Sequence, residues 1–543
     1  MGRIEPYASQ QDCEESGGRL TTRRAGRLQQ IAFDATPINA AAINVAARVG
    51  WLLAMSRLHH VDSSFQDGRV FAAALAEAGL PASRSLVSRW ESGEIQASYE
   101  AMAAYEVVLG LPEGQISSIT SYVGAIMPSV KVRQARPRLD PASPEFAVRL
   151  DELLDLAEDG RAKARDWQYL GWHLAAAPLV HLRRSAWAAL ATRLVTDLPR
   201  SVKLAYRQYS AAAFNFALVP RAQSYLVEAI AAYVADPDVQ VVTTPVGLLD
   251  RLPTRPAAKL VLDIVENPSN DNAFAGGVWL AAEKLGRAHF TPAERDRLDM
   301  IVLQLWRRDP GRASEDLAEL IAGMPEGMRA PLVQAATRAG RRKLGYAVEH
   351  GEELVATRAR SVAQQVADQA RLLVPQEPSY GEDRMLTRLV REALFHRDSE
   401  RRHLAALLIA SSPFGRSVSD CVLTMLADRE QTSWMRTRLA TLVRYLSDET
   451  HRLRMMRLLD DPDQSVRAPI IHGIGHMQLS ATSDQLLRAS LGEDWSLVEQ
   501  AKMYALGMSG SPGLSAIAKS PTAPAWQRSA ARWWRRQGAA LRT

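Results

Sequence analysis

The sequence predicts an all-α protein. Segments rich in Ala and Leu, with apolar residues at helical spacing, follow one another from about residue 38 to the end, separated by short Pro, Gly and Asp turns. Runs of β-branched residues are almost absent: residues 239–243 form the single clear one, and after Asp236-Pro237 this run suits a loop equally well. At 543 residues the chain is too long for one compact core, so we expect several domains or an extended repeat array.

Five short helices are predicted near the N-terminus. Residues 1–37 are polar, and we expect a flexible arm there. Apolar periodicity then places helices at about 38–58, 68–78, 83–91, 99–109 and 114–126. Ser83 is a good N-cap for the third helix, and Gly93 is placed to adopt a left-handed conformation after it. We therefore expect one helical domain over residues 38–127.

The third helix has two predicted faces. Val87 and Trp90 lie three residues apart, so they share one face, which we expect to be buried. The opposite face carries short hydroxyls and guanidiniums, namely Arg84, Ser85, Ser88 and Arg89. Such groups donate hydrogen bonds to base edges and phosphates in the major groove of DNA.

This pattern resembles the helix-turn-helix domain of Xre-type, lambda-repressor-like regulators, over about residues 40–125. The resemblance rests on Ala74-Leu75 in a scaffold helix, Gly79 in the turn, Val87 and Trp90 within the third helix, Glu91-Ser-Gly93 after it, and the segment 105–112. Gly79 and Val87 are eight residues apart, about two more than is usual in the family, so the turn is longer. The resemblance implies that the third helix reads double-stranded DNA, with contacts from Arg84, Ser85, Ser88, Arg89, Ser83, Gln66 and Arg69. Gln66 is the nearest equivalent of a glutamine that the family often has at the start of its second helix.

The overall charge does not explain DNA binding. Net charge is +6, but residues 1–145 hold 14 Lys and Arg against 15 Asp and Glu. Positive charge must therefore act locally, and we expect flanking phosphate contacts from Arg23, Arg24, Arg27, Lys131 and Arg133. Residues 128–145 are basic and rich in Pro, as expected of a stiff linker.

The C-terminal part of the chain repeats. We expect a helical region over 146–390 and helix-pair repeats over 391–543, with copies at 394–410, 426–446, 459–475, 491–507 and 520–537. Aligning the copies on Arg467 brings Arg402, Arg436, Glu499 and Gln527 into register, about 30 residues apart, and these side chains are expected to bridge repeats. The layout resembles HEAT-like repeats, which implies an α-solenoid that acts as a scaffold or sensor. Together with the N-terminal resemblance, it is similar to large actinobacterial-type regulators.

Other polar patterns favour structural roles. His472 and His476 have the i, i+4 spacing of a metal pair, but no third ligand is evident, so we expect no metal site and no cofactor. Asp460, Asp461 and Asp463 suit helix capping better than calcium binding. The basic, Trp-containing C-terminus suits a terminal helix that covers the array, with a nucleic-acid or partner surface as the alternative; its members are Arg528, Arg532, Trp533, Trp534, Arg535 and Arg536.

These observations favour a sequence-specific DNA-binding transcriptional regulator, working as a homodimer, with a protein or small-molecule effector on the solenoid. Phosphate-loop, dinucleotide, metalloprotease and nucleophile-elbow motifs are absent from the sequence, which argues against an enzyme. We expect no membrane segment and a cytoplasmic, nucleoid-associated protein, in keeping with only two cysteines. Two alternatives stay open: a protein-binding scaffold with a docking domain, and a HEAT-type DNA-repair glycosylase.

Overall fold

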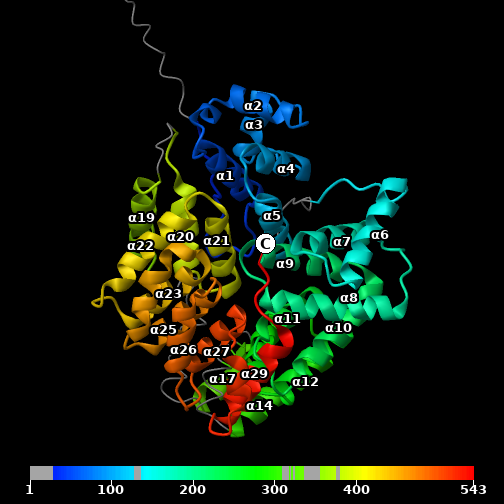
Figure 1. Ribbon diagram of the computed structural model, residues 1–543, viewed down its shortest axis with the longest axis vertical. Coiled ribbons are helices and arrows are strands. Elements are labelled where there is room, and N and C mark those ends of the chain that lie inside the picture. Colours follow the sequence, from blue (N-terminus) through cyan, green and yellow to red (C-terminus); the bar gives the residue numbers. More distant parts are fainter. Residues whose placement is uncertain are drawn as a thin grey trace, which may run out of the picture.

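The computed structural model describes residues 29–127, 136–308, 317, 320–321, 324–335, 355–374 and 380–542. Within these ranges every regular element is a helix, so the predicted all-α class is confirmed (Figure 1). Residues 239–242 form a loop that leads into a short helix. Val239 and Val242 of this loop are buried. Among the described residues, no helix combines the length and apolar character needed to cross a membrane.

The N-terminal helices lie close to their predicted positions. Their bounds are α1 (Val45–Leu58), the 3₁₀ turn η1 (Ser63–Gln66), α2 (Gly68–Glu77), α3 (Arg84–Glu91), α4 (Tyr99–Val108) and α5 (Gln115–Ile126). Polar caps start four of them, because the side chains of Asn44, Asp67, Ser83 and Ser98 accept hydrogen bonds from first-turn amides. The connection between α2 and α3 covers residues 78–83, which agrees with the long turn expected from the sequence.

The first helix is shorter than predicted, since it begins at Val45 and not near residue 38. The preceding backbone is non-helical because its carbonyl groups are bonded to the C-terminal third of the chain. His396 lies 3.0 Å from the carbonyl oxygen of Ile38, and Arg401 donates to that of Ala40 at 3.3 Å. Asn44 then caps the helix.

The middle of the chain consists of packed helix pairs. Helix α7 packs along α9, so closely that a Cβ at Gly171 would lie 2.9 Å from the backbone of Ala212. Similarly, α8 packs on α10 and α12 packs on α13. The bounds are α6 (Pro144–Glu158), α7 (Ala164–Ala176), α8 (Arg184–Asp197), η2 (Leu198–Arg200), α9 (Lys203–Ala217), α10 (Pro220–Val234), α11 (Thr243–Gly247), η3 (Leu248–Arg251), α12 (Arg255–Glu266), α13 (Asp271–Gly286), α14 (Pro292–Arg308) and α17 (Glu326–Ala335).

The C-terminal third contains the five helices expected from the repeats. They are α21, α23, α25, α27 and α29, and each packs against the next in this order. All bounds in this region are α19 (Ala356–Leu372), α20 (Arg384–Phe395), α21 (Ser399–Ser411), α22 (Gly415–Ala427), α23 (Ser433–Leu446), η4 (Glu449–His451), α24 (Arg452–Met456), η5 (Arg457–Asp460), α25 (Gln464–Gly475), α26 (Ala481–Ala489), α27 (Leu497–Ser509), α28 (Leu514–Lys519) and α29 (Ala525–Gln537).

Two of the aligned polar residues link neighbouring copies. Arg436 of α23 pairs with Asp461 before α25, and Gln527 of α29 donates to the carbonyl oxygen of Gly492 before α27 at 2.7 Å. By contrast, Arg402 and Glu499 bond within their own copies. The bridging expectation therefore holds at two positions, where a long side chain faces the turn of the adjacent copy.

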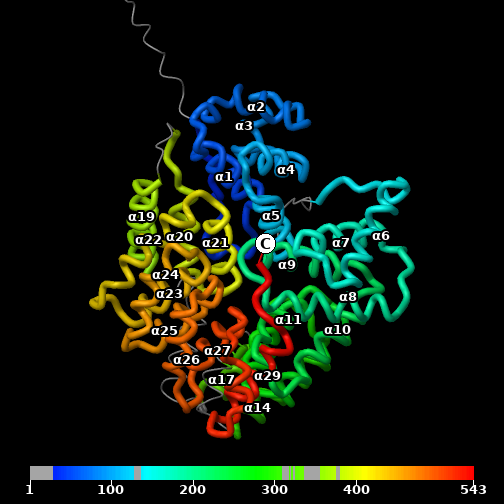
Figure 2. The backbone as a smooth tube through the Cα atoms, viewed as in Figure 1, coloured from blue at the N-terminus to red at the C-terminus, as the bar shows by residue number. Residues whose placement is uncertain are grey.

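The C-terminal tail, described to residue 542, returns to the middle of the chain. The tail pairs with the segment before α9: Val202 donates to Leu541 at 3.2 Å, and Leu541 donates to Arg200 at 2.9 Å. Figure 2 shows this tail ending near the centre of the molecule. Helix α5 packs on both α9 and α21, and buried apolar side chains form one connected core from Ile31 to Trp534. The N-terminal helices are thus built into the body.

Candidate nucleic-acid interface

Helix α3 has two faces of opposite character. Val87 and Trp90 are buried, with 1% and 7% of their surface exposed, as the sequence predicted. The opposite face is open to solvent, and its exposed side chains are Ser83, Arg84, Ser85, Ser88 and Arg89. Figure 1 shows α2 and α3 at one end of the molecule, with α1 between them and the body. The predicted contact face is therefore accessible.

Close backbone contact fixes α3 against α1. A Cβ at Gly50 of α1 would lie 2.6 Å from the carbonyl oxygen of Trp90, and one at Gly93 would lie 2.7 Å from the Cα of Ala47. Gly93 also has a φ of +73°, which glycine adopts without strain. At the other end, Ser83 caps the helix by accepting from the amide of Leu86 at 3.1 Å. Both ends of α3 are thus held in place.

A buried ion pair joins α3 to α1. The guanidinium of Arg57 binds both carboxylate oxygens of Glu91, each at 2.6 Å, with only 2% of either side chain exposed. Tyr105 and Gln29 also donate to this carboxylate, at 3.1 and 2.7 Å. Burial alone would lower the pKa of Arg57, but the hydrogen bonds and charge of Glu91 raise it overall. The paired arginine remains charged and holds the end of α3.

A second buried cluster fixes α1 to the C-terminal third. Arg48 binds Asp34 at 2.7 Å and both oxygens of Glu392 at 2.7 Å. Arg388 and Arg401 share Glu392, at 2.9 and 3.1 Å. Burial alone would raise the pKa of Glu392, but Arg48 and Arg401 hold it far below its usual range. This cluster determines how α1, and with it α3, is oriented on the body.

The charge around the exposed face of α3 is mixed. Arg89 pairs with Glu94 at 2.9 Å, in a pair open to solvent. The aliphatic part of Arg84 lies against Gly68, where a Cβ would approach it to 3.4 Å, so the start of α2 is next to the start of α3. Arg69 is exposed on α2 beside this point. Positive charge on this face therefore comes from individual arginines, one of which, Arg89, has an acidic partner.

Gln66 is placed differently from the other predicted contact residues. It is half-buried at the end of η1, and its amide nitrogen lies 3.5 Å from the carbonyl oxygen of Leu58. The predicted phosphate contacts Arg23, Arg24, Arg27, Lys131 and Arg133 fall outside the described residues. Of the basic side chains after the fifth helix, Arg136 and Arg138 are described, and both are exposed.

Sequence reasoning missed the anchoring residues of this surface. Arg48 stands alone as a charge within an apolar stretch, a pattern that signals a buried partner, but its partner Glu392 is 344 residues away. Glu91 marked only the end of the third helix in the sequence. In the structure it is the carboxylate that connects α3 to Arg57.

The histidine and aspartate patterns of the C-terminal repeats make contacts within the protein. His476 bonds to Tyr504 at 3.0 Å, and burial lowers the pKa of His476 to about 3. Asp463 caps α25, whereas Asp461 pairs with Arg436. No group of three or more His, Cys, Asp or Glu side chains within the described ranges is arranged to hold a metal ion.

The C-terminal helix α29 divides its aromatic and basic side chains between two faces. Trp533 and Trp534 are buried, whereas Arg532 and Arg536 are exposed. Arg536 pairs with Asp236 at 2.6 Å, in the loop after α10. The tryptophans cover the end of the repeat series, and the arginines join it to the middle of the chain.

Comparison of the chain with protein-family models and with curated proteins gives no match.

Proposed function

We propose that this protein is a sequence-specific, double-stranded DNA-binding regulator of transcription, with α3 as the helix that enters the major groove. The observation that supports this is the two-sided structure of α3. Its apolar side chains and Glu91 anchor it, and its free face presents only hydroxyls, guanidiniums and backbone groups at one end of the molecule. An α-helix that projects such a face has the shape and donors that the major groove accepts.

Each predicted contact residue has a specific role in this proposal. Arg84 and Arg89 bind guanine edges or phosphates, and Ser85 and Ser88 bind bases or phosphates through their hydroxyls. Arg89 exchanges its exposed partner Glu94 for DNA, which is a small loss because exposed ion pairs are worth about 0–1 kcal/mol. Ser83, Arg69 and Gln66 make further contacts with the DNA next to the start of α3, which Ser83 also caps.

The helix pairs of the C-terminal third form a HEAT-like solenoid in this proposal. The stacking of α21, α23, α25, α27 and α29 in order supports it. The protein binds DNA as a homodimer on paired half-sites, and the solenoid supplies the dimer contact or a surface for an effector. Because α1 is fixed to the body by Arg48, a change in the body reaches α3 through a rigid connection.

The decisive experiment selects bound sites from random double-stranded DNA with the full chain. The affinity for the selected site is then measured in the presence of competitor DNA, for the wild type and for Arg84→Ala/Arg89→Ala. We expect the variant to lose at least tenfold in specific affinity, because each good Arg–guanine contact contributes about 1–3 kcal/mol of discrimination. The matched control is Arg149→Ala/Arg161→Ala, which removes two exposed arginines of α6 and the loop after it.

The possible outcomes separate the candidate functions. If a correctly folded Arg84→Ala/Arg89→Ala protein binds its selected site unchanged, α3 is not the reading helix. Uniformly weak binding with no selected sequence favours the scaffold alternative. Preference for damaged over intact duplex, with base release, favours the glycosylase.

A further inference from the structure

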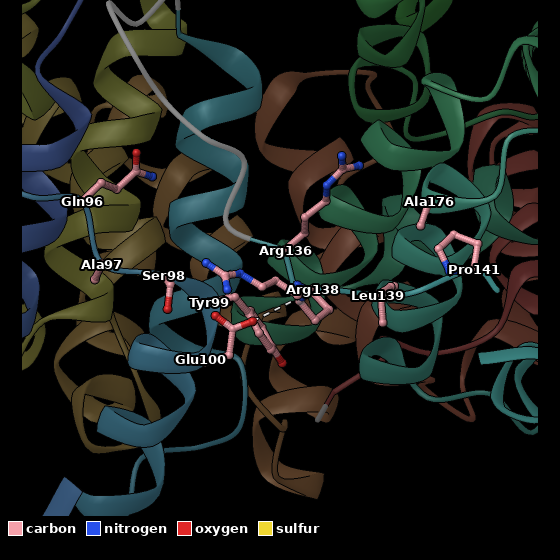
Figure 3. A pocket seen from close by; sticks show the side chains of 11 residues that line it. Gln96, Ala97, Ser98, Tyr99, Glu100, Arg136, Arg138, Leu139, Pro141 and Ala176 are labelled. Atoms are coloured by element: carbon pink, nitrogen blue, oxygen red, sulfur yellow. Dashed lines mark hydrogen bonds between the residues drawn. The ribbon is translucent and has the colours of Figure 1, made fainter. Parts of the chain in front are cut away.

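A cavity lies beside the proposed reading unit. Its volume is about 700 Å³, and three parts of the chain line it: the connection after α3 with the start of α4, the segment 136–141, and the end of α7 at Ala176 (Figure 3). Pockets of about 300–1,000 Å³ accommodate small organic ligands. The cavity is thus large enough for a molecule with more than one ring.

The walls of the cavity are already fixed in position. The hydroxyl of Tyr99 bonds to that of Tyr169 at 2.9 Å, and the ring of Tyr99 packs edge-on against Trp172 at 5.0 Å. The amide of Arg138 donates to Glu100 at 3.2 Å, which ties the segment 136–141 to α4. A preformed site loses less free energy in ordering when a ligand binds.

The lining combines apolar surface with positive charge. Leu139, Pro141 and Ala176 form an apolar side, and Tyr99 supplies an aromatic ring. Arg138 extends toward the start of α4, whereas Arg136 extends the other way (Figure 3). Neither guanidinium forms an ion pair within 4.0 Å among those of the described residues. The charge of Arg138 nevertheless helps to lower the pKa of Glu100, so this arginine already faces a carboxylate, and Arg136 is the fork more open to an anion.

We propose that this cavity binds a small organic anion that has a flat apolar body and one carboxylate or phosphate group. The apolar body lies against Leu139, Pro141 and the ring of Tyr99, and the anion pairs with the guanidinium of Arg138 or Arg136. Glu100 excludes a second negative charge near the start of α4. Carboxylate and phosphate share this recognition chemistry.

The position of the cavity links occupancy to α3, a step that rests on the proposed function. The wall residues Gln96, Ala97 and Ser98 directly follow the connection in which the amide of Ile95 bonds to the carbonyl oxygen of Arg89 at 3.1 Å. A bound anion joins this connection to α7 and to the segment 136–141. It therefore restricts the mobility of the C-terminal end of α3 when bound.

Calorimetry on the full chain tests binding without DNA. The probes are 2-naphthoate, 2-naphthyl phosphate and the neutral 2-naphthalenemethanol. We expect at least one anion to bind at least tenfold more tightly than the alcohol, and the two anions distinguish carboxylate from phosphate. Arg136→Ala/Arg138→Ala removes this preference, and Ala176→Phe, which fills the cavity, weakens all three probes at least tenfold.

The matched control Arg149→Ala/Arg161→Ala, outside the cavity, binds the probes as the wild type does. Failure of both anions to bind the wild type overturns the proposal, and so does binding that survives both cavity variants. A second measurement follows the affinity for selected DNA with and without the tighter anion, where we expect at least a threefold change. If the affinity for DNA is unchanged by the anion, the link to α3 is wrong but the anion site stands. If the protein binds the probes but selects no DNA sequence, only the proposed function is wrong.

Discussion

Two neighbouring helices, α1 and α3, each carry two arginines, and the arginines of one helix have the opposite environment to those of the other. Arg48 and Arg57 of α1 are buried, and in the described part of the chain their ion pairs are with the carboxylates of Asp34, Glu392 and Glu91. Arg84 and Arg89 of α3 are exposed, and Arg89 has only a solvent-exposed partner. The same residue type therefore holds the structure together on one helix and is available for an external anion on the other.

This difference assigns the positioning of α3 to the buried arginines of α1, and the proposed recognition of DNA to the exposed arginines of α3. A buried guanidinium that loses its carboxylate keeps a charge in an apolar environment, which is strongly unfavourable. An exposed guanidinium that changes partners loses little. The rigidity of the reading unit should therefore depend on α1, and its DNA affinity on α3.

Removal of the shared carboxylate should have the largest effect on stability. Glu392→Ala leaves Arg48, Arg388 and Arg401 in one buried site with Asp34 alone. We expect a loss in the free energy of unfolding at the upper end of about 3–5 kcal/mol, measured by urea denaturation. The control Glu152→Ala breaks an exposed pair with Arg149 and should lose less than about 1 kcal/mol. Equal midpoints for the two variants would contradict the anchoring role of the cluster.

Truncation of the buried aromatic of α3 should come next. Trp90→Ala removes a ring that packs against Tyr105, at 6.5 Å between centroids, and leaves a cavity. We expect a loss near the lower end of about 3–5 kcal/mol, because Arg57 still holds Glu91. Faster hydrogen exchange confined to α3 and its neighbours would show this local loss. The control Ser88→Ala, on the exposed face, should change stability by less than about 0.5 kcal/mol, and an unshifted melting curve for Trp90→Ala would refute the packing role.

The sequence predicted the helices and the buried face of α3 because these depend on residues close together in the chain. Periodicity placed Val87 and Trp90 inward, and the caps Ser83 and Asp67 have local partners. The anchoring of α1 depends on Glu392, whose distance along the chain gives no local pattern. The start of α1 was misplaced for the same reason, since distant side chains bind the backbone before it. Which arginines bind carboxylates and which face solvent is decided by packing between distant segments.

A third set of charges, at the end of α5, should make stability depend on pH. Arg251 donates to the carbonyl oxygen of Ala125 at 3.0 Å and pairs with Glu400 at 3.2 Å. Here burial, only partly opposed by Arg251 and Arg287, raises the pKa of Glu400 to about 7. Burial and neighbouring carboxylates raise the pKa of Glu283 to about 8. The folded structure therefore favours the neutral form of Glu283 and Glu400, whereas it favours the charged form of Glu392.

The sign of the pH effect follows from these pKa values. Between the ordinary carboxyl pKa and about 8, the folded chain retains a proton on Glu283 that the unfolded chain has lost, so stability falls as the pH rises. Buried histidines such as His476, whose pKa is lowered, act in the opposite direction near pH 6.5, so the test compares the wild type with Glu283→Gln. From pH 6.5 to 8 the wild type should lose free energy of unfolding relative to this variant, by at most about 1.4 kcal/mol per pH unit, as measured by urea denaturation. Burial lowers the pKa of Lys284 to about 8, so the opposing contribution of that residue is about half developed at the upper end of this window. A difference in free energy of unfolding between the wild type and Glu283→Gln that stays constant from pH 6.5 to 8 would contradict the role of Glu283.

The smallest stability change should come from Arg89, whose loss should nevertheless weaken DNA binding. Its pair with Glu94 is about half exposed, so Arg89→Ala should change the free energy of unfolding by about 0–1 kcal/mol, while the affinity for selected DNA falls by about 1–3 kcal/mol. Glu94→Ala provides the sharper test, because it breaks the same pair from the other side. If Arg89 only stabilises the helix through its pair with Glu94, the two variants should change the affinity for DNA by the same amount. If Arg89 contacts DNA, Glu94→Ala should preserve or increase the affinity, because it frees the guanidinium and removes a negative charge from the surface that meets the phosphates.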